Sequence, residues 1–298
     1  MELRVLEYFV EIAREGNMSR VAEKMHISQP TLSKQMKLLE EELDTKLFTR
    51  VASGLILTDE GMLLKKRAED ILSLVDKTAA EFKEMDNITG GEVFIGCAES
   101  YLISHLADAI REFRKNYPLF QYHLLSGNSE QVLERLDRGL IDFAVIVEPP
   151  DLSKYNYLGM PGADTLGLLM LPDHPLAKKD TITFEDLQGI ELIASEQTVK
   201  NDLPRWCGED TDKINITGTC NLFFNGSVFV KAGLGALITF DHLAETGENC
   251  SLVFRPFFPA LKVKMFIVWK KYQIFTPIGD RLLNHLKREF SNETETEA

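Results

Sequence analysis

The chain has 298 residues, of which 44% are hydrophobic and 27% are charged, and its formal net charge is −13. This length predicts two or three domains, and the composition excludes a disordered chain, a collagen and a coiled-coil rod. No apolar run approaches the ~20 residues of a membrane helix, and acidic residues interrupt the first apolar stretch, so we expect neither a membrane partner nor a signal peptide. Four cysteines are too few for a disulfide framework here, which favours a reducing cytoplasm. The negative charge argues at first sight against nucleic acid as a partner.

The first sixty residues are predicted to form short helices. An apolar face recurs at helical spacing in the first of them, at Leu3, Leu6, Val10 and Ala13. Gly16 is a typical helix end, and Asn17 is a typical cap for a second helix over residues 19–25.

Ser28 is the predicted cap of a third helix, with Pro30 in the first turn, where its missing N–H costs nothing. Its predicted buried stripe is Leu32, Met36, Leu39 and Leu43. The opposite face is polar and cationic near its start, whereas three consecutive glutamates, 40–42, stand near its end.

Residues 46–58 are rich in β-forming side chains and predict a hairpin with its turn at Ser53-Gly54. Residues 59 to about 85 then predict one long helix. Apolar positions step along it in a heptad pattern at Leu64, Ala68, Ile71, Val75, Thr78, Phe82 and Met85. This seam favours packing against another helix, such as that of a second copy. A linker is expected at Thr89-Gly90-Gly91.

Beyond residue 91, short apolar runs alternate with amphipathic ones. The strand-like runs are 93–97, 121–125, 143–147, 166–171, 191–194, 236–239 and 263–269. The helix-like runs include 103–115, 130–138, 225–232 and 279–290. This alternation predicts βαβ units and a mostly parallel sheet.

Catalytic and metal-binding motifs are missing from the sequence. The six histidines are scattered without metal-ligand spacing, and neither a nucleophile elbow nor a phosphate-binding glycine loop occurs. We therefore expect no enzyme, no metal and no cofactor.

The second and third helices are joined by the tight turn Met25-His26-Ile27, which is typical of a helix-turn-helix. In that motif the start of the second helix enters the major groove of DNA. The side chains expected to face DNA are Gln29, Pro30, Thr31, Ser33, Lys34 and Lys37. Gln29 can read a base, most naturally adenine, while the lysines suit phosphates. The alternative is a helical hairpin with a solvated polar face.

Residues 1–61 resemble the winged helix-turn-helix of LysR-type transcriptional regulators. The resemblance rests on SQPTLSKQMKLLEEELDTKLF, residues 28–48, followed by Arg50 and LTDEG, residues 57–61. It continues through GEVFIG, LDRGLIDFAV, HPLA, FEDL and VKAGLGALI at residues 91–96, 136–145, 174–177, 184–187 and 230–238.

The departures from the family pattern in the first sixty residues include one at the end of the recognition helix and one in the wing. Asp44 replaces a glycine that usually ends the recognition helix, which predicts slight strain in a left-handed corner. The wing reads Arg50 to Gly54 without the usual minor-groove arginine; Arg50 and Ser53 are our candidates there.

The resemblance implies a multidomain α plus α/β protein: a winged helix-turn-helix (1–58), a long linker helix (59–88), and a two-lobed, periplasmic-binding-protein-like (type II) α/β effector domain. Lobe I would comprise residues 89–162 and 266–298, and lobe II residues 163–265. It also implies a homodimer or homotetramer on double-stranded DNA with an inverted-repeat operator.

A small-molecule effector would bind between the lobes, where strands end and helices begin. Carried over by position, the ligand candidates are Ser100, Ser126, Asn128, Ser195, Thr198 and Phe224. Ordinary helix capping by the serines and the asparagine is the alternative.

Glu99, Glu148 and Glu196 flank the same loops. They raise the hypothesis that at least one lines the pocket and favours a polar neutral or amine-bearing effector; solvated rim carboxylates are the alternative.

Two further alternatives stay open. Cys207, with Arg205 nearby to lower its pKa, and Cys220 could sense peroxide. The other alternative is a ligand-binding protein of the same architecture with weakened DNA binding.

The negative charge lies mainly outside the predicted DNA-binding domain. Residues 1–58 hold 8 Lys and Arg against 9 Asp and Glu, a net charge of −1, so −12 of the total −13 belongs to the residues beyond them. Attraction to DNA must then come from the placement of cations rather than from net charge.

Overall fold

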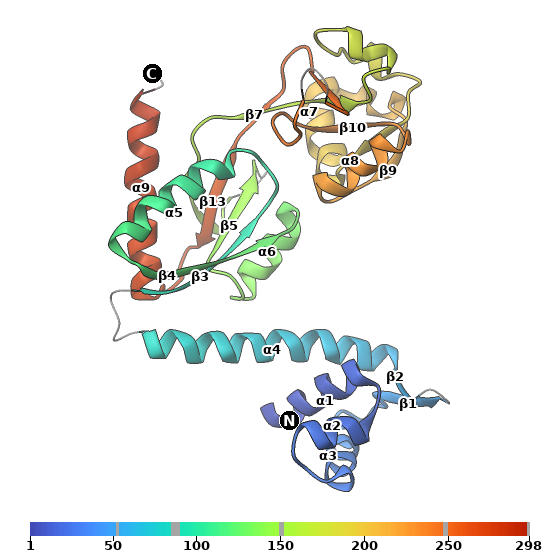
Figure 1. The fold of residues 1–298 in the computed structure, drawn as a ribbon, viewed down its shortest axis with the longest axis vertical. Coiled ribbons are helices and arrows are strands. Elements are labelled where there is room, and N and C mark those ends of the chain that lie inside the picture. Colours follow the sequence, from blue (N-terminus) through green and yellow to red (C-terminus); the bar gives the residue numbers. More distant parts are fainter. Residues whose placement is uncertain (52–53, 85–89, 149–151, 247–249, 297–298) are drawn as a thin grey trace. The chain divides into compact units, whose positions relative to one another are not determined.

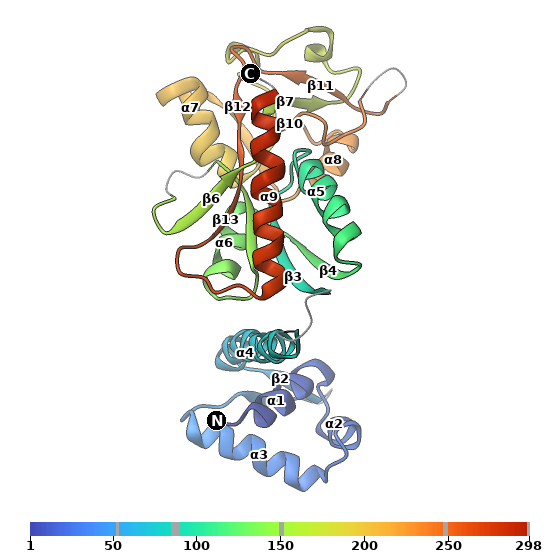
Figure 2. The ribbon, with the colours of Figure 1, turned by 90° about the vertical axis from the view of Figure 1, so that its left-hand side faces the viewer.

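The computed structural model describes residues 1–51, 54–84, 90–148, 152–246 and 250–296, and the chain divides into two compact units, Met1–Lys83 and Glu84–Ala298 (Figures 1 and 2). Ser53, Met85 and Thr89, expected in the wing, seam and linker, lie outside the described residues. Among the helices that are described, none is both long and apolar enough to cross a membrane.

The first unit begins with helices α1 (Leu3–Glu15), α2 (Met18–Lys24) and α3 (Gln29–Glu42). The predicted caps are confirmed: Asn17 Oδ1 accepts from the backbone N–H of Ser19 (2.9 Å), and Ser28 Oγ accepts from that of Thr31 (3.3 Å). The helices enclose an apolar core whose fully buried members include Phe9, Ile12, Val21, Leu32 and Leu39.

Two positions that the periodicity placed in this core are exposed, Leu3 at 45% and Leu43 at 38%. Leu3 lies in the first turn of α1, whose buried arc is centred on Phe9, and Leu43 lies at the end of α3, where the helix has already left the core. Asp44 does adopt the predicted left-handed conformation, with φ 48°.

The wing consists of the antiparallel strands β1 (Phe48–Val51) and β2 (Gly54–Leu57). The backbone N–H of Leu55 donates to the carbonyl oxygen of Gly16 (2.9 Å), which holds the wing to the end of α1. A Cβ on Gly54 would lie 2.6 Å from that same oxygen, so only glycine fits this approach.

The predicted seam lies along the long helix α4 (Asp59–Glu84), and its two halves differ in burial. Ala68 is fully buried in the core of the first unit, and Leu64 and Ile71 pack against that core. Val75 and Phe82, further along, are exposed at 38% and 68%. The first half of the seam therefore packs within its own unit, and only the second half is open to another chain.

Lobe I of the second unit contains a sheet in the order β4-β3-β5-β13-β6. Its strands are β3 (Gly90–Cys97), β4 (Leu119–Ser126), β5 (Phe143–Val147), β6 (Tyr155–Gly159) and β13 (Met265–Lys270). Alternate residues of β5 join different apolar clusters, one shared with α5 (Ile103–Asn116) and α9 (Pro277–Thr296) and one with α6 (Ser129–Asp137). Helices therefore cover both faces of the sheet, which explains why β5 is apolar throughout.

Lobe II contains a second sheet, in the order β11-β7-β10-β8-β9, with β12 (Lys262–Val263) paired to β7. Its strands are β7 (Asp164–Met170), β8 (Leu192–Ala194), β9 (Ile216–Thr219), β10 (Ala236–Phe240) and β11 (Val253–Pro256). The helices α7 (Leu203–Cys207) and α8 (Phe223–Lys231) belong to this lobe.

The chain passes between the lobes twice, between β6 and β7 and again between β12 and β13, and β13 begins at Met265. The expectation of mostly parallel sheets is wrong. β7 runs antiparallel to β10 and β11, and β13 runs antiparallel to β5 and β6. Both strands arrive directly from the other lobe and so enter their sheet at the edge where the parallel strands end, which reverses their direction.

Candidate functional site

The start of α3 presents the polar surface that the sequence predicts. Gln29, Pro30 and Thr31 are exposed, as are Lys34 and Lys37, whereas Ser33 is half-buried. The Thr31 hydroxyl lies 2.7 Å from Ser28 Oγ, so it takes part in the helix cap as well as facing outward. The first turn of the helix thus offers side chains and backbone N–H groups to a ligand at its N-terminal end.

The basic side chains of this unit differ in their partners. Lys37 Nζ lies 3.4 Å from a carboxylate oxygen of Glu41, one turn further along α3. Lys34 forms no ion pair with any residue that the structure describes. Arg50 is exposed on β1, and Ser53 lies outside the described residues. Lys34 is therefore the more available cation for a phosphate.

The acidic end of α3 is partly withdrawn from the surface. Glu40 accepts hydrogen bonds from Lys46 Nζ (2.6 Å) and from the backbone N–H of Leu47 (2.9 Å). Burial raises the pKa of Glu40, but the hydrogen bonds from Lys46 and Leu47 outweigh it and hold the pKa below its usual value. Glu40 therefore fixes the turn between α3 and the wing.

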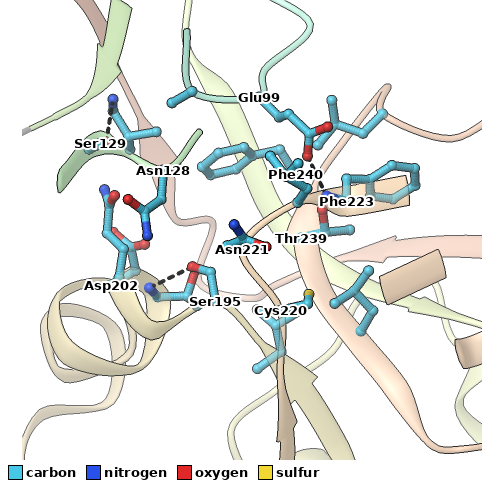
Figure 3. A pocket seen from close by; sticks show the side chains of 18 of the residues that line it. Glu99, Asn128, Ser129, Ser195, Asp202, Cys220, Asn221, Phe223, Thr239 and Phe240 are labelled. Carbon is cyan, nitrogen blue, oxygen red and sulfur yellow. Dashed lines mark hydrogen bonds between the residues drawn. The ribbon is translucent and has the colours of Figure 1, made fainter. Parts of the chain in front are cut away.

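A cleft lies in the second unit where strand ends of both lobes meet (Figure 3). Loops after β3 and β4 contribute from lobe I, and loops after β8, β9 and β10 contribute from lobe II. Its polar lining residues include Glu99, Asn128, Ser129, Ser195, Thr198, Asp202, Asn221 and Thr239. Its apolar lining residues include Val147, Leu166, Phe223 and Phe240.

Three of the ligand candidates line this cleft: Asn128, Ser195 and Thr198. The other three are not among the residues that line it. Ser100 is 4% exposed and donates to Asp164 Oδ2 (2.6 Å), away from the lining. Ser126 is exposed at the end of β4 and Phe224 is 71% exposed on α8. Position along the strand–helix loop predicted proximity to the cleft, but not side-chain direction.

Helix capping, the alternative role of these residues, is also present. Asn128 Oδ1 accepts from the backbone N–H of Gln131 (2.8 Å) at the start of α6. Ser195 Oγ accepts from the backbone N–H of Thr198 (3.0 Å). The oxygen atoms of Asn128 and Ser195 therefore already accept hydrogen bonds from the helix backbone. The Nδ2 of Asn128 takes no part in its cap.

The three flanking glutamates have different partners. Glu99 lines the cleft, and its carboxylate accepts from the backbone N–H of Phe223 at the start of α8, so that it connects the lobes. Glu148 pairs with Arg205 (3.2 Å) and Glu196 pairs with Lys200 (3.0 Å).

The sequence patterns missed Asp202, which is 5% exposed and lines the cleft. Burial is the main cause that raises its pKa to about 6, opposed by Arg205 and by a hydrogen bond from Thr198. Its spacing of four residues from Thr198 was the available signal, because a helical turn brings such residues to one face. Ser129, Asn221, Thr239 and Phe240 were missed as well, and no local pattern marks them.

The surroundings of Cys207 and Cys220 disfavour the alternative of peroxide sensing. Burial raises the pKa of Cys207 and that of Cys220, which disfavours the reactive thiolate at either position. The idea that Arg205 lowers the pKa of Cys207 is wrong, because the guanidinium donates to Glu148 and to the carbonyl oxygen of Lys262. Cys97 is buried as well, and its pKa is raised to about 12.

Known protein families match both units. Residues 3–62 match the bacterial regulatory helix-turn-helix proteins of the lysR family, and residues 87–291 match the LysR substrate binding domain. The chain is 30% identical over 242 residues to a "Probable RuBisCO transcriptional regulator" of Nostoc sp. (strain PCC 7120 / SAG 25.82 / UTEX 2576), covering 79% of this chain and 71% of that protein. It is 26% identical over 294 residues to the "HTH-type transcriptional activator CmpR" of Synechocystis sp. (strain ATCC 27184 / PCC 6803 / Kazusa), covering 95% and 94%.

Solved structures share the fold. Full-length CbnR, crystallised with its target DNA, superposes with a TM-score of 0.74 at 21% identity, covering 97% of this chain and all of that one. Full-length BenM superposes with a TM-score of 0.54 at 23% identity, covering 99% of this chain and 98% of that one. Together with the two family matches, which span the helix-turn-helix and the cleft, these relatives show that the chain belongs to the LysR-type transcriptional regulators, DNA-binding proteins that oligomerise and carry an effector-binding domain, and is not an enzyme.

Proposed function

We propose that this regulator reads its operator through the first turn and a half of α3. Gln29 would read a base and Lys34 would contact a phosphate, with Pro30, Thr31, Ser33, Lys37 and the wing residues Arg50 and Ser53 around them. The observation that carries this proposal is the exposure of Gln29 and Lys34 beside the capped N-terminus of α3, while Glu40 is drawn away by Lys46 and Leu47.

Two recognition helices would act together in a dimer on an inverted repeat, with half-sites one helical turn or a multiple apart. The exposed part of α4, around Val75 and Phe82, supports pairing with a second copy. A tetramer requires further contacts between effector domains. The four cysteines, all of them free, support action in the cytoplasm.

An effector bound in the cleft would shift the population of lobe arrangements. Glu99 of lobe I and Phe223 of lobe II are joined directly by a hydrogen bond. A ligand placed between them would therefore change the stability of the lobe arrangement in which this bond is formed. That shift would be read out as a change in DNA bend or half-site spacing.

Binding-site selection from random DNA, followed by measurement of the Kd of the Gln29→Ala variant, tests this proposal. The selected sites should contain an inverted repeat. Gln29→Ala should weaken selected sites by about 1–3 kcal/mol while changing random DNA little, because only base readout is lost. If selection yields no sequence, or if the variant loses affinity equally on all DNA, the base-reading role fails; the first result favours a ligand-binding protein without operator recognition.

A further inference from the structure

The wall of the effector cleft carries charge of one sign. Glu99 and Asp202 are its acidic members, and among the described residues that line it none is a lysine, an arginine or a histidine. An adjoining hollow on the side of α6 shares Asn128 and Ser129 with the cleft and is lined by further acidic residues, Glu130, Glu134, Asp137 and Glu196. Its one described cation, Lys200, pairs with Glu196 (3.0 Å). The carboxylates of the cleft and of the adjoining hollow repel an anion and attract a cation.

Asp202 forms no ion pair within the described part of the chain, although the charge of Arg205 acts on it from nearby. Its side chain is 5% exposed, and its hydrogen bond comes from Thr198, whose hydroxyl in turn accepts from Ser195 Oγ (2.9 Å). Arg205 stands near enough to lower its pKa but donates its hydrogen bonds to Glu148 and to the Lys262 carbonyl oxygen. A buried carboxylate held this way gains from any cation that enters the cleft.

Glu99 occupies the position where an anionic ligand would otherwise bind. Its carboxylate accepts from the backbone N–H of Phe223, at the positive N-terminal end of α8 (Figure 3). A ligand carboxylate at this helix end would have to displace Glu99 and would then lie beside its displaced charge. The chain therefore supplies its own anion at α8 and leaves the charge of Asp202 unmatched.

The surroundings of Asp202 suit an organic cation rather than a metal ion. No group of three or more potential metal ligands of the His, Cys, Asp and Glu types occurs among the described residues, whereas a divalent ion needs several oxygen ligands. Asn128 and Ser129 of lobe I lie near Asp202 and Ser195 of lobe II, and Phe240 also lines the cleft (Figure 3). Polar groups and a buried carboxylate beside apolar and aromatic lining residues fit an ammonium group on a short apolar body.

We propose that the effector of this regulator is a small amine, protonated at neutral pH, whose ammonium group pairs with Asp202. The inference rests on the proposed function of the cleft as the effector site. Glu99 acts as a selectivity residue that excludes carboxylate ligands from the end of α8.

The chain offers a matched control for Asp202. Asp164 is 2% exposed, and burial raises its pKa to about 6 as well, but it does not line the cleft and its carboxylate accepts from Ser100 Oγ (2.6 Å). Asp202→Asn and Asp164→Asn therefore remove the same kind of buried charge, and only the first removes it from the cleft.

Thermal unfolding and calorimetric titration of the full chain test the proposal, with n-butylamine and 1,4-diaminobutane as probes against 1-butanol and butanoate, which have the same carbon skeleton. Both amines should bind saturably and raise the unfolding temperature, and neither the alcohol nor the carboxylate should. Asp202→Asn should weaken amine binding about tenfold or more, while Asp164→Asn should leave it within about twofold. Lowering the pH from 7.5 to 5 should weaken binding about tenfold, since Asp202 is then mostly protonated while the amine keeps its charge.

Three results would overturn the proposal: amine binding unchanged in Asp202→Asn, stabilisation by butanoate but by neither amine, or no binding by either amine. DNA binding of the same protein is measured without ligand, so failure of the amine series leaves the operator-reading result standing, and loss of operator recognition leaves the amine result standing.

Discussion

The start of α3 and the effector cleft treat charge in opposite ways. At α3, Lys34 stands open while Glu40 is engaged by Lys46 and Leu47, so the exposed surface near the helix start is cationic despite the acidic sequence that follows. In the cleft, Asp202 forms no ion pair among the described residues, and Arg205 donates instead to Glu148. Local pairing, more than net charge, decides which ligand each region attracts. Substitutions that break or spare these pairs should therefore have different and measurable effects.

The largest expected effect concerns the two buried aspartates. Because burial raises the folded-state pKa of Asp164 from 3.8 to about 6, folding binds a proton, and the associated stability is complete below pH 4 and lost as the pH rises through 6. Asp164→Asn keeps an acceptor for Ser100 and removes the buried charge, so it should raise the free energy of unfolding at pH 8 by at most about 3 kcal/mol. The gain should vanish at pH 4.

The two tryptophans, Trp206 and Trp269, both belong to the second unit, so urea unfolding followed by tryptophan fluorescence reports on that unit alone. Asp202→Asn should stabilise the unit in the same way while weakening amine binding. No gain for either variant at pH 8 would show that these carboxylates are better compensated than their burial indicates.

A smaller effect is expected at the end of α3. Glu40→Ala removes the acceptor of the Leu47 N–H and the partner of Lys46, and should destabilise the first unit by about 2 kcal/mol. Calorimetry measures this loss, and amide exchange at Leu47 should accelerate. Because the pKa of Glu40 is held below its usual value, the wild-type advantage should disappear as the pH falls through the acid range. Glu41→Ala, on the exposed side of α3, should change stability by less than about 0.5 kcal/mol.

The smallest stability effect is expected at the left-handed corner. Asp44 has φ 48°, a conformation that glycine adopts without a Cβ penalty. Asp44→Gly should therefore stabilise the first unit by about 0.5–1 kcal/mol, whereas Asp44→Ala should destabilise it, since alanine lacks the short polar side chain that helps aspartate there. Equal effects of the two substitutions on the calorimetric midpoint would contradict this assignment of strain.

The first unit could be predicted nearly in full because its signals are local. Asn17 and Ser28 bond backbone groups two or three residues away, so their types and positions determine where the helices begin. The wing and α4 follow the same logic. Leu3 and Leu43 were misplaced because burial at a helix end depends on what packs beyond it.

The second unit was predicted in outline, and its cleft only in part. Alternating apolar runs located most strands, but the direction of β7 and β13 depends on their arrival from the other lobe, which no periodicity records. Asp202 and Asn221 share the cleft with Asn128 only because distant loops meet there. Ser126 illustrates the converse: a polar residue at a strand end can be exposed without being among the residues that line the cleft.

The salt dependence of operator binding tests the central claim, that exposed and unpaired cations at α3 carry DNA affinity, most directly. Fluorescence anisotropy gives log Kd against log salt concentration for wild type, Lys34→Ala and Lys37→Ala on one selected operator. Lys34→Ala should weaken binding on every sequence and reduce the slope by about one, because one phosphate is no longer neutralised, whereas Lys37→Ala should change the slope less, because Glu41 already offsets that charge. An unchanged slope and affinity in Lys34→Ala would contradict the claim.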